Sequence, residues 1–186
     1  KPKIFDPDEA EQLRSRCHGN EAIVTSVKET EKKVKAPKLY DLTTLQREAN
    51  RIYGMTAKQT LDTAQSLYEK KLITYPRTDS QYLTEDMEQT ARNVVRQIYE
   101  KYQLTGPFDQ PEQPDVKKVM NNSKVTDHHA IIPTLELASC HLDELKSWEE
   151  KILFLIAVHT VMAMSKDHIY QETEIEVECQ GEIFKA

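Results

Sequence analysis

Strand-like patterns lie at both ends of this chain, and the long middle between them is patterned as helix. In residues 172–179 glutamate alternates with Thr, Ile, Val or Cys, and residues 23–27 alternate apolar or β-branched residues with others. Such alternation predicts strands with one buried and one wet face. Because the strand regions flank the helical middle, we predict an α+β fold. In it, a helical domain of residues 40–165 is inserted between two pieces, 1–39 and 166–186, of a β-rich domain.

Local signals divide the chain further. Patterns typical of capping boxes predict three helix starts: Thr43-x-x-Gln46, Thr56-x-x-Gln59 and Ser147-x-x-Glu150. Asp6-Pro7 predicts a short first helix, and another helix is expected from about Thr84 to a stop at Gly106-Pro107. The charged run 29–38 ends in Ala-Pro and predicts a domain boundary, while the Pro-rich, polar segment 107–126 predicts a loop.

Composition indicates a soluble protein. The 186 residues are 38% hydrophobic and 30% charged, enough for one domain or one and a part. The formal charge of −6 argues against a protein held on nucleic acid mainly by phosphate contacts, although a local DNA groove is compatible with it. Tight DNA binding by this segment alone is therefore not expected.

No segment is patterned to cross or enter a membrane. The longest apolar run, 152–164, is interrupted by His159 and Thr160, so a buried helix is predicted instead. The chain begins at Lys1 without a signal-peptide pattern, and its three cysteines are widely spaced. We therefore expect a cytoplasmic segment of a longer protein, with reduced thiols and no membrane partner.

The string Ile73–Ser80, ITYPRTDS, concentrates reactive side chains. Pro76 favours an extended Tyr75, and in an extended chain the side chains of Tyr75 and Arg77 point the same way, about 6–7 Å apart. A cation beside a phenol favours the phenolate and binds the charge of a phosphoryl group under attack. The alternative is a buried tyrosine in a turn, with a local ion pair between Arg77 and Asp79.

Three motifs carry a resemblance to a known family. The string 73–80 resembles the active-site signature of type IA DNA topoisomerases, and its proline is similar to the topoisomerase III branch. The segment 127–134, DHHAIIPT, resembles the second motif of the same domain, and 40–46, YDLTTLQ, the helix start that opens it. The resemblance implies a helical domain inserted into a β-rich hinge domain.

The resemblance also implies a chemistry. Tyr75 would attack a single-strand phosphodiester to give a 5′-phosphotyrosyl bond, followed by passage of another strand and religation without ATP. Arg77 would hold the scissile phosphate, and His128 would bind phosphate or shuttle a proton. A further set is expected to contact DNA: Thr74, Thr78, Asp79, Ser80 and His129. Turn capping is the alternative for Thr78 and Ser80, and a supporting role for His129.

The metal that the resemblance implies has no ligands here. The family uses Mg²⁺ held by an acidic cluster in a separate N-terminal domain, and no such pattern occurs in this sequence. We therefore expect a monomeric fragment with single-stranded DNA and the missing N-terminal metal-binding domain as partners. It would bind no metal and be inactive alone. The alternative is a non-catalytic DNA-binding or interaction module with the same fold.

Overall fold

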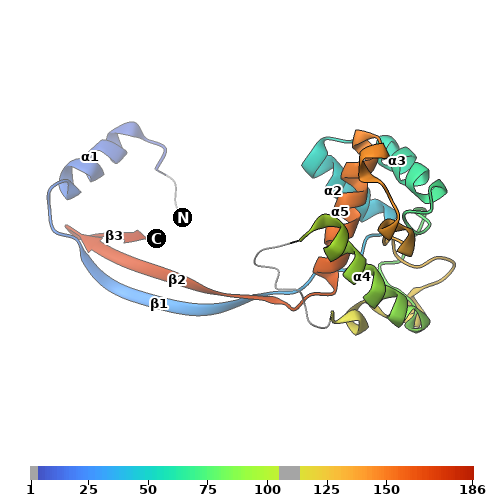
Figure 1. The fold of residues 1–186 in the computed structure, drawn as a ribbon. Coiled ribbons are helices and arrows are strands. Elements are labelled where there is room, and N and C mark those ends of the chain that lie inside the picture. The colour runs from blue at the N-terminus through green and yellow to red at the C-terminus, as the bar shows by residue number, and fades with distance from the viewer. Residues whose placement is uncertain (1–3, 105–113) are drawn as a thin grey trace. The chain divides into compact units, whose positions relative to one another are not determined.

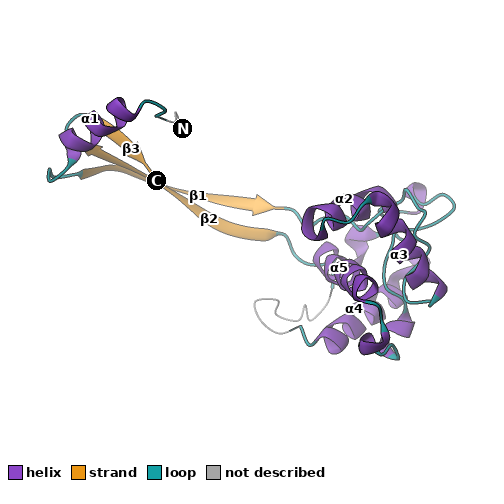
Figure 2. Cartoon of the chain, turned by 90° about the horizontal axis from the view of Figure 1, so that it is seen from above, coloured by secondary structure: helices purple, strands orange, loops and turns teal. Residues whose placement is uncertain are grey.

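The computed structural model describes residues 4–104 and 114–186, which form two compact units (Figure 1). The first comprises residues up to Val34 and from His168 onward, and the second is the continuous stretch Lys35–Asp167. The mixture of helices and a small sheet confirms the predicted α+β class (Figure 2). The predicted boundaries at 39/40 and 165/166 lie a few residues from the limits of these units.

The first unit is a three-stranded antiparallel sheet with one helix. Its elements are α1 (Pro7–Cys17), β1 (Ile23–Val34), β2 (His168–Cys179) and β3 (Glu182–Lys185), with the strands in the order β1-β2-β3. Asp6 caps α1 as predicted, because its carboxylate accepts from the Asp8 amide at 2.9 Å. The thiols of Cys17 and Cys179 each donate to the other residue's carbonyl at 3.7 Å, which joins α1 to β2.

The strands differ from the expectation in two ways. β1 continues beyond the predicted strand residues 23–27 through the charged run to Val34, because β2 lies opposite along its length. The limit between the two units, Val34/Lys35, still lies within the charged run 29–38. Oppositely charged side chains also meet diagonally across the pair, as in the 3.3 Å contact of Lys32 with Glu172. The predicted buried face is also absent from most of β2, where Cys179 is the one fully buried residue.

Four α-helices build the second unit: α2 (Leu42–Tyr53), α3 (Ala57–Glu69), α4 (Glu88–Tyr102) and α5 (Ser147–Ala163). The capping box at Thr56 is confirmed. The other two boxes lie earlier than predicted. Asp41 and Thr44 cap α2, with the Thr44 amide 2.7 Å from the Asp41 carboxylate, and Glu149 reaches back to the Lys146 amide at 3.0 Å to begin α5.

Short 3₁₀ turns complete the unit. One at Glu85–Met87 precedes α4, and others span Val116–Val119, Asn122–Lys124, Leu135–Ala138 and Leu142–Glu144. Val116 and Val119 are buried, so the described part of the expected loop 107–126 is anchored to the core at these two residues, while most of its other residues are exposed. The predicted helix stop at Gly106-Pro107 lies outside the described residues, and α4 itself ends at Tyr102, followed by Gln103 with a left-handed backbone.

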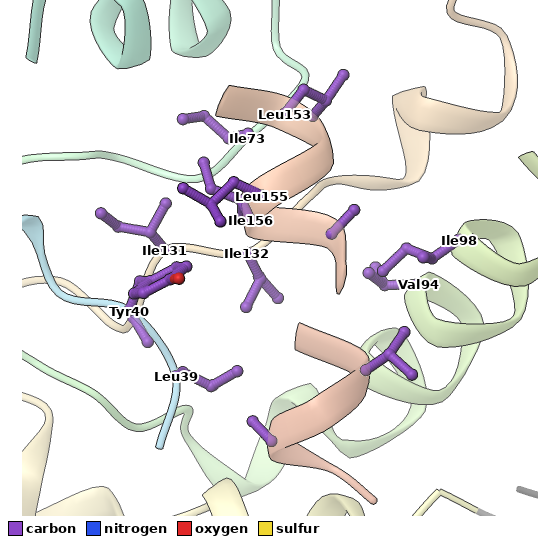
Figure 3. Close-up of a cluster of buried hydrophobic side chains, with 14 of the residues drawn as sticks. Leu39, Tyr40, Ile73, Val94, Ile98, Ile131, Ile132, Leu153, Leu155 and Ile156 are labelled. Atoms are coloured by element: carbon purple, nitrogen blue, oxygen red, sulfur yellow. The ribbon is translucent and has the colours of Figure 1, made fainter. Parts of the chain in front are cut away.

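The core surrounds α5, which is buried on several sides and packs on α2, α3 and α4. This confirms the predicted buried helix. Ile73, Ile131 and Ile132 enter the same cluster from non-helical segments, together with Leu39 and Tyr40 (Figure 3). The core thus fixes the two segments that carry the sequence motifs. Among the described residues, no helix has the length and apolar character needed to span a bilayer.

A buried carboxylate links α5 to α3. The Glu149 side chain is 3% exposed and accepts hydrogen bonds from Ser66 Oγ and Lys70 Nζ, both at 2.6 Å. Burial opposes the charged form, but the hydrogen bonds from Lys70, Ser66 and the Lys146 amide outweigh it and lower the pKa of Glu149 to about 2.

We predict that Glu149→Gln lowers the free energy of unfolding by about 2 kcal/mol at pH 7, because Lys70 and Ser66 lose a charged acceptor. Because the folded pKa lies below the unfolded one, the contribution of Glu149 is complete above the unfolded pKa and is lost as pH falls. The gap between the parent chain and the variant should therefore narrow from about pH 5 downward. Urea unfolding across this pH range measures it.

The matched control is Glu150→Gln, which changes the neighbouring exposed glutamate of α5. It should leave the unfolding free energy nearly unchanged. Equal effects of the two substitutions would contradict the role given to Glu149.

Candidate functional site

The string 73–80 leaves α3 through a sharp turn. Lys71, just past the end of α3, has a positive φ of 61°, which only a minority of non-glycine residues adopt. The turn is held at both sides: the Leu72 amide donates to the Leu67 carbonyl at 2.9 Å, and the Thr134 hydroxyl donates to the Lys71 carbonyl. Leu72 and Ile73 are then buried, so the residues that follow start from a fixed point.

A backbone clasp joins this string to the second motif. Ile73 pairs with Pro133 in an antiparallel bridge, and the Thr74 amide donates to the Ile132 carbonyl at 2.9 Å. The Thr74 hydroxyl donates to the Ala130 carbonyl at 2.9 Å and accepts from the Ile132 amide at 3.0 Å. Residues more than fifty positions apart in the sequence are therefore held side by side.

The hydroxyls of Thr78 and Ser80 also serve this scaffold. Thr78 Oγ1 donates to the His128 carbonyl at 3.0 Å and accepts from the Ser80 amide at 3.1 Å. Ser80 Oγ donates to the Lys124 carbonyl at 2.9 Å. Both side chains are buried. These contacts support the capping alternative for Thr78 and Ser80, and the same holds for the hydroxyl of Thr74.

The phenol ring of Tyr75 lies against two other rings. Its centroid is 4.4 Å from that of His128, at an interplanar angle of 46°, and 5.3 Å from that of Tyr68 in an edge-on contact. Tyr75 is partly exposed and His128 is exposed. Among the described residues, no group hydrogen-bonds to the Tyr75 hydroxyl. The phenol is thus fixed by ring packing, while its oxygen is unoccupied by a protein partner.

Arg77 is exposed and forms no ion pair within the described part of the chain. The local pair with Asp79, on which the turn alternative relied, is absent there. The chain bends at Pro76 and Arg77, so the expectation of a straight extended run was wrong, and the alternation argument does not apply. Arg77 follows Tyr75 by two positions in the sequence, and no carboxylate among the described residues forms an ion pair with its guanidinium.

His129 and Asp79 are placed differently. His129 is partly buried, and its Nδ1 lies 2.9 Å from the Ala130 carbonyl, which fits the supporting role considered for it. Asp79 is exposed. A direct DNA contact stays a prediction for both residues.

Tyr68 is a neighbour of Tyr75 that the sequence analysis did not include in the site. It is 39% exposed and contacts the Tyr75 ring. Its position in the last turn of α3, shortly before Tyr75, is the one sequence signal that could have indicated this contact.

The third motif, residues 40–46, contributes a buried part of the scaffold around the site. Tyr40 is buried, its carbonyl accepts from the Ile131 amide at 2.8 Å, and its ring stacks on His159 with centroids 3.7 Å apart. His159 Nε2 lies 2.7 Å from the Lys38 carbonyl. Burial raises the pKa of Tyr40 and lowers that of His159. This pair is therefore a neutral part of the scaffold.

The donor set does not suit a metal. Within residues 4–104 and 114–186, no group of three or more His, Cys, Asp or Glu side chains is arranged to hold an ion. Mg²⁺ prefers several oxygen ligands in a near-octahedral arrangement. The described residues do not fit it, and no step proposed below passes through it.

Comparison with known proteins agrees with the motifs. A family described as DNA topoisomerase matches residues 1–186. The chain is 38% identical over 187 residues to DNA topoisomerase 3 of Bacillus subtilis (strain 168), covering 99% of this chain and 25% of that protein. It is 36% identical over 173 residues to DNA topoisomerase 3 of Salmonella typhimurium, covering 91% and 26%.

A solved structure is similar over the whole chain. Full-length topoisomerase I from Thermotoga maritima aligns with a TM-score of 0.70 and 27% identity, covering 100% of this chain and 30% of that one. This chain spans about a quarter of the length of its curated relatives. With the motif match, these findings show that the chain belongs to the DNA topoisomerase family of type IA and corresponds to a segment of a topoisomerase III-like protein.

Proposed function

We propose that this segment supplies the nucleophile of a DNA strand-cleaving and rejoining enzyme, with Tyr75 as that nucleophile. The observation that carries the proposal is the packed phenol ring of Tyr75, set against His128 and two residues from the unpaired guanidinium of Arg77. Ring packing holds the phenol in place, while its oxygen has no hydrogen-bond partner among the described residues to displace. Such pre-organisation lowers the cost of attack on a bound phosphate.

The proposed reaction conserves the phosphodiester energy. The Tyr75 oxygen bonds to phosphorus, the bond from phosphorus to the 3′ oxygen breaks, and the phenol proton leaves as the 3′ hydroxyl gains one. Arg77 balances charge on the phosphate oxygens. His128 lies where it can bind that phosphate or hold the proton. Attack by the 3′ hydroxyl on the phosphotyrosine reverses every step, so no ATP is required.

The remaining parts of the enzyme are assigned to the parent protein. We propose single-stranded DNA as the substrate, a cytoplasmic setting, and a separate N-terminal domain for the ligands of Mg²⁺. When bound, that ion would neutralise phosphate charge. The segment by itself is then a monomer that forms no adduct.

A non-catalytic DNA-binding or interaction module is the second candidate. The formal charge of −6 favours it. The position of Tyr75 does not, because a module without chemistry has no use for a phenol packed against an imidazole, with an arginine two positions along the chain that has no ion-pair partner among the described residues.

We predict that Tyr75→Phe in the full-length parent protein abolishes covalent attachment to DNA, because the attacking oxygen is removed while the ring packing remains. Each protein is incubated with an end-labelled single strand and Mg²⁺ and then denatured. For the unsubstituted protein, label at the 3′ end should stay on the protein, and label at the 5′ end should leave with the 3′-hydroxyl fragment. Tyr53→Phe is the control. An adduct formed by Tyr75→Phe would move the module candidate ahead.

For Arg77→Ala we predict cleavage slower by roughly 100-fold, as for the loss of one charged donor at a reacting phosphate. The melting temperature should stay close to that of the parent, since Arg77 is exposed. Single-turnover adduct formation measures the rate, and Arg96→Ala, an exposed arginine of α4, is the control. Equal rates for the two variants would remove Arg77 from the mechanism.

A further inference from the structure

A cluster of two lysines, Lys38 and Lys124, lies around Tyr82, two residues beyond the string 73–80. Lys124 Nζ is 4.9 Å from the centroid of the Tyr82 ring and 3.5 Å from its hydroxyl. Lys38 Nζ is 5.6 Å from the same centroid. Partial burial opposes ionisation of this phenol, but Lys124 and Lys38 together lower its pKa. Two ammonium groups and one hydroxyl therefore converge.

The cluster lacks an anion. Within the described part of the chain, neither Lys38 nor Lys124 forms an ion pair with a carboxylate. Asp167, which lines the same hollow as Lys38, accepts from the Ala36 amide at 3.1 Å and from Lys118 Nζ at 3.4 Å. Its charge is shared with groups other than these two lysines. Two close cations without a counter-charge attract a ligand that carries one.

A hollow of about 440 Å³ opens beside the cluster. Its lining includes three lysines, Lys35, Lys38 and Lys118, together with Tyr82 and one carboxylate, Asp167. This volume is within the range of ligand sites and exceeds what a single phosphate group requires. The excess of lysines over carboxylates in the lining favours an anionic ligand.

The cluster is tied to the same two segments as Tyr75 and His128. Ser80 ends the string, and its Oγ donates to the Lys124 carbonyl at 2.9 Å and accepts from the Tyr82 amide at 3.2 Å. The Ala130 amide donates to the Tyr82 carbonyl at 2.9 Å. The segments that carry Tyr75 and His128 are therefore hydrogen-bonded to the residues that carry the cluster.

We propose that Lys38, Lys124 and the Tyr82 hydroxyl bind a backbone phosphate of the single-stranded DNA whose scissile phosphate lies at Tyr75. The inference rests on the proposed function and adds a subsite to it. The ligand group is a phosphodiester, not a base, because both lysines lie over the Tyr82 ring and occupy the surface on which a base would stack.

The test uses the full-length parent protein with Tyr75→Phe, so that binding is measured without cleavage. The probe is a fluorescein-labelled oligothymidylate, titrated over a range of KCl concentrations. Lys38→Gln and Lys124→Gln should each weaken binding about fivefold and lower the salt slope by about 0.7, the value for one lost phosphate contact to a single strand. Lys58→Gln, an exposed lysine of α3, should change neither quantity.

Two outcomes would overturn the subsite. In the first, both lysine variants match Lys58→Gln in affinity and salt slope. In the second, the losses vanish on an abasic strand of equal length, which would assign the contact to bases. Equal losses on both strands support the phosphate assignment.

The subsite and the proposed function fail separately. With Tyr75 intact, Lys58→Gln should form the covalent adduct as the parent protein does, because Lys58 lies in neither the reacting centre nor the subsite. A parent protein that forms no adduct removes the nucleophile assignment but leaves the binding comparison readable. Normal adduct formation with unchanged binding removes the subsite alone.

Discussion

The antiparallel clasp between residues 72–74 and 130–134 is the contact on which the site depends. It consists of few hydrogen bonds, but the core covers it from one side through Ile73, Ile131 and Ile132. Buried backbone groups must find partners, so neither segment can move without exposing unsatisfied donors and acceptors. The hydroxyl of Thr74 reinforces the clasp because it both donates and accepts there. The positions of Tyr75 and His128 follow from this junction.

Within residues 73–80, some side chains hold the backbone in place and others are free to meet a ligand. Ile73, Pro76, Thr78 and Ser80 are buried, whereas Arg77 and Asp79 reach solvent. From the sequence alone, each polar residue of this string is a candidate for a contact with DNA. The hydrogen bonds show instead that the small hydroxyls hold the backbone, and that the larger side chains are left to meet a ligand.

Sequence periodicity was sufficient for the helical middle and for the α+β class, because these depend on local patterns. It failed where contacts with residues far along the chain decide where a strand or helix begins or ends. β1 extends through a lysine- and glutamate-rich run because β2 pairs with it, and α5 begins one residue early because Glu149 is drawn to Ser66 and Lys70. The contact of Tyr75 with His128 was accessible only through the family resemblance. No rule of spacing brings together residues so far apart.

The composition of the β1–β2 pair affects how easily this part of the chain opens locally. Most of its residues are exposed on both faces, so cross-strand hydrogen bonds and charge pairs stabilise it with little apolar burial. Regions of this kind open with small local free energies, while amides beneath α5 exchange only through larger openings. Backbone hydrogen exchange should therefore be graded within this single polypeptide. The β1–β2 pair can therefore open locally while the segments around Tyr75 and His128 keep their geometry.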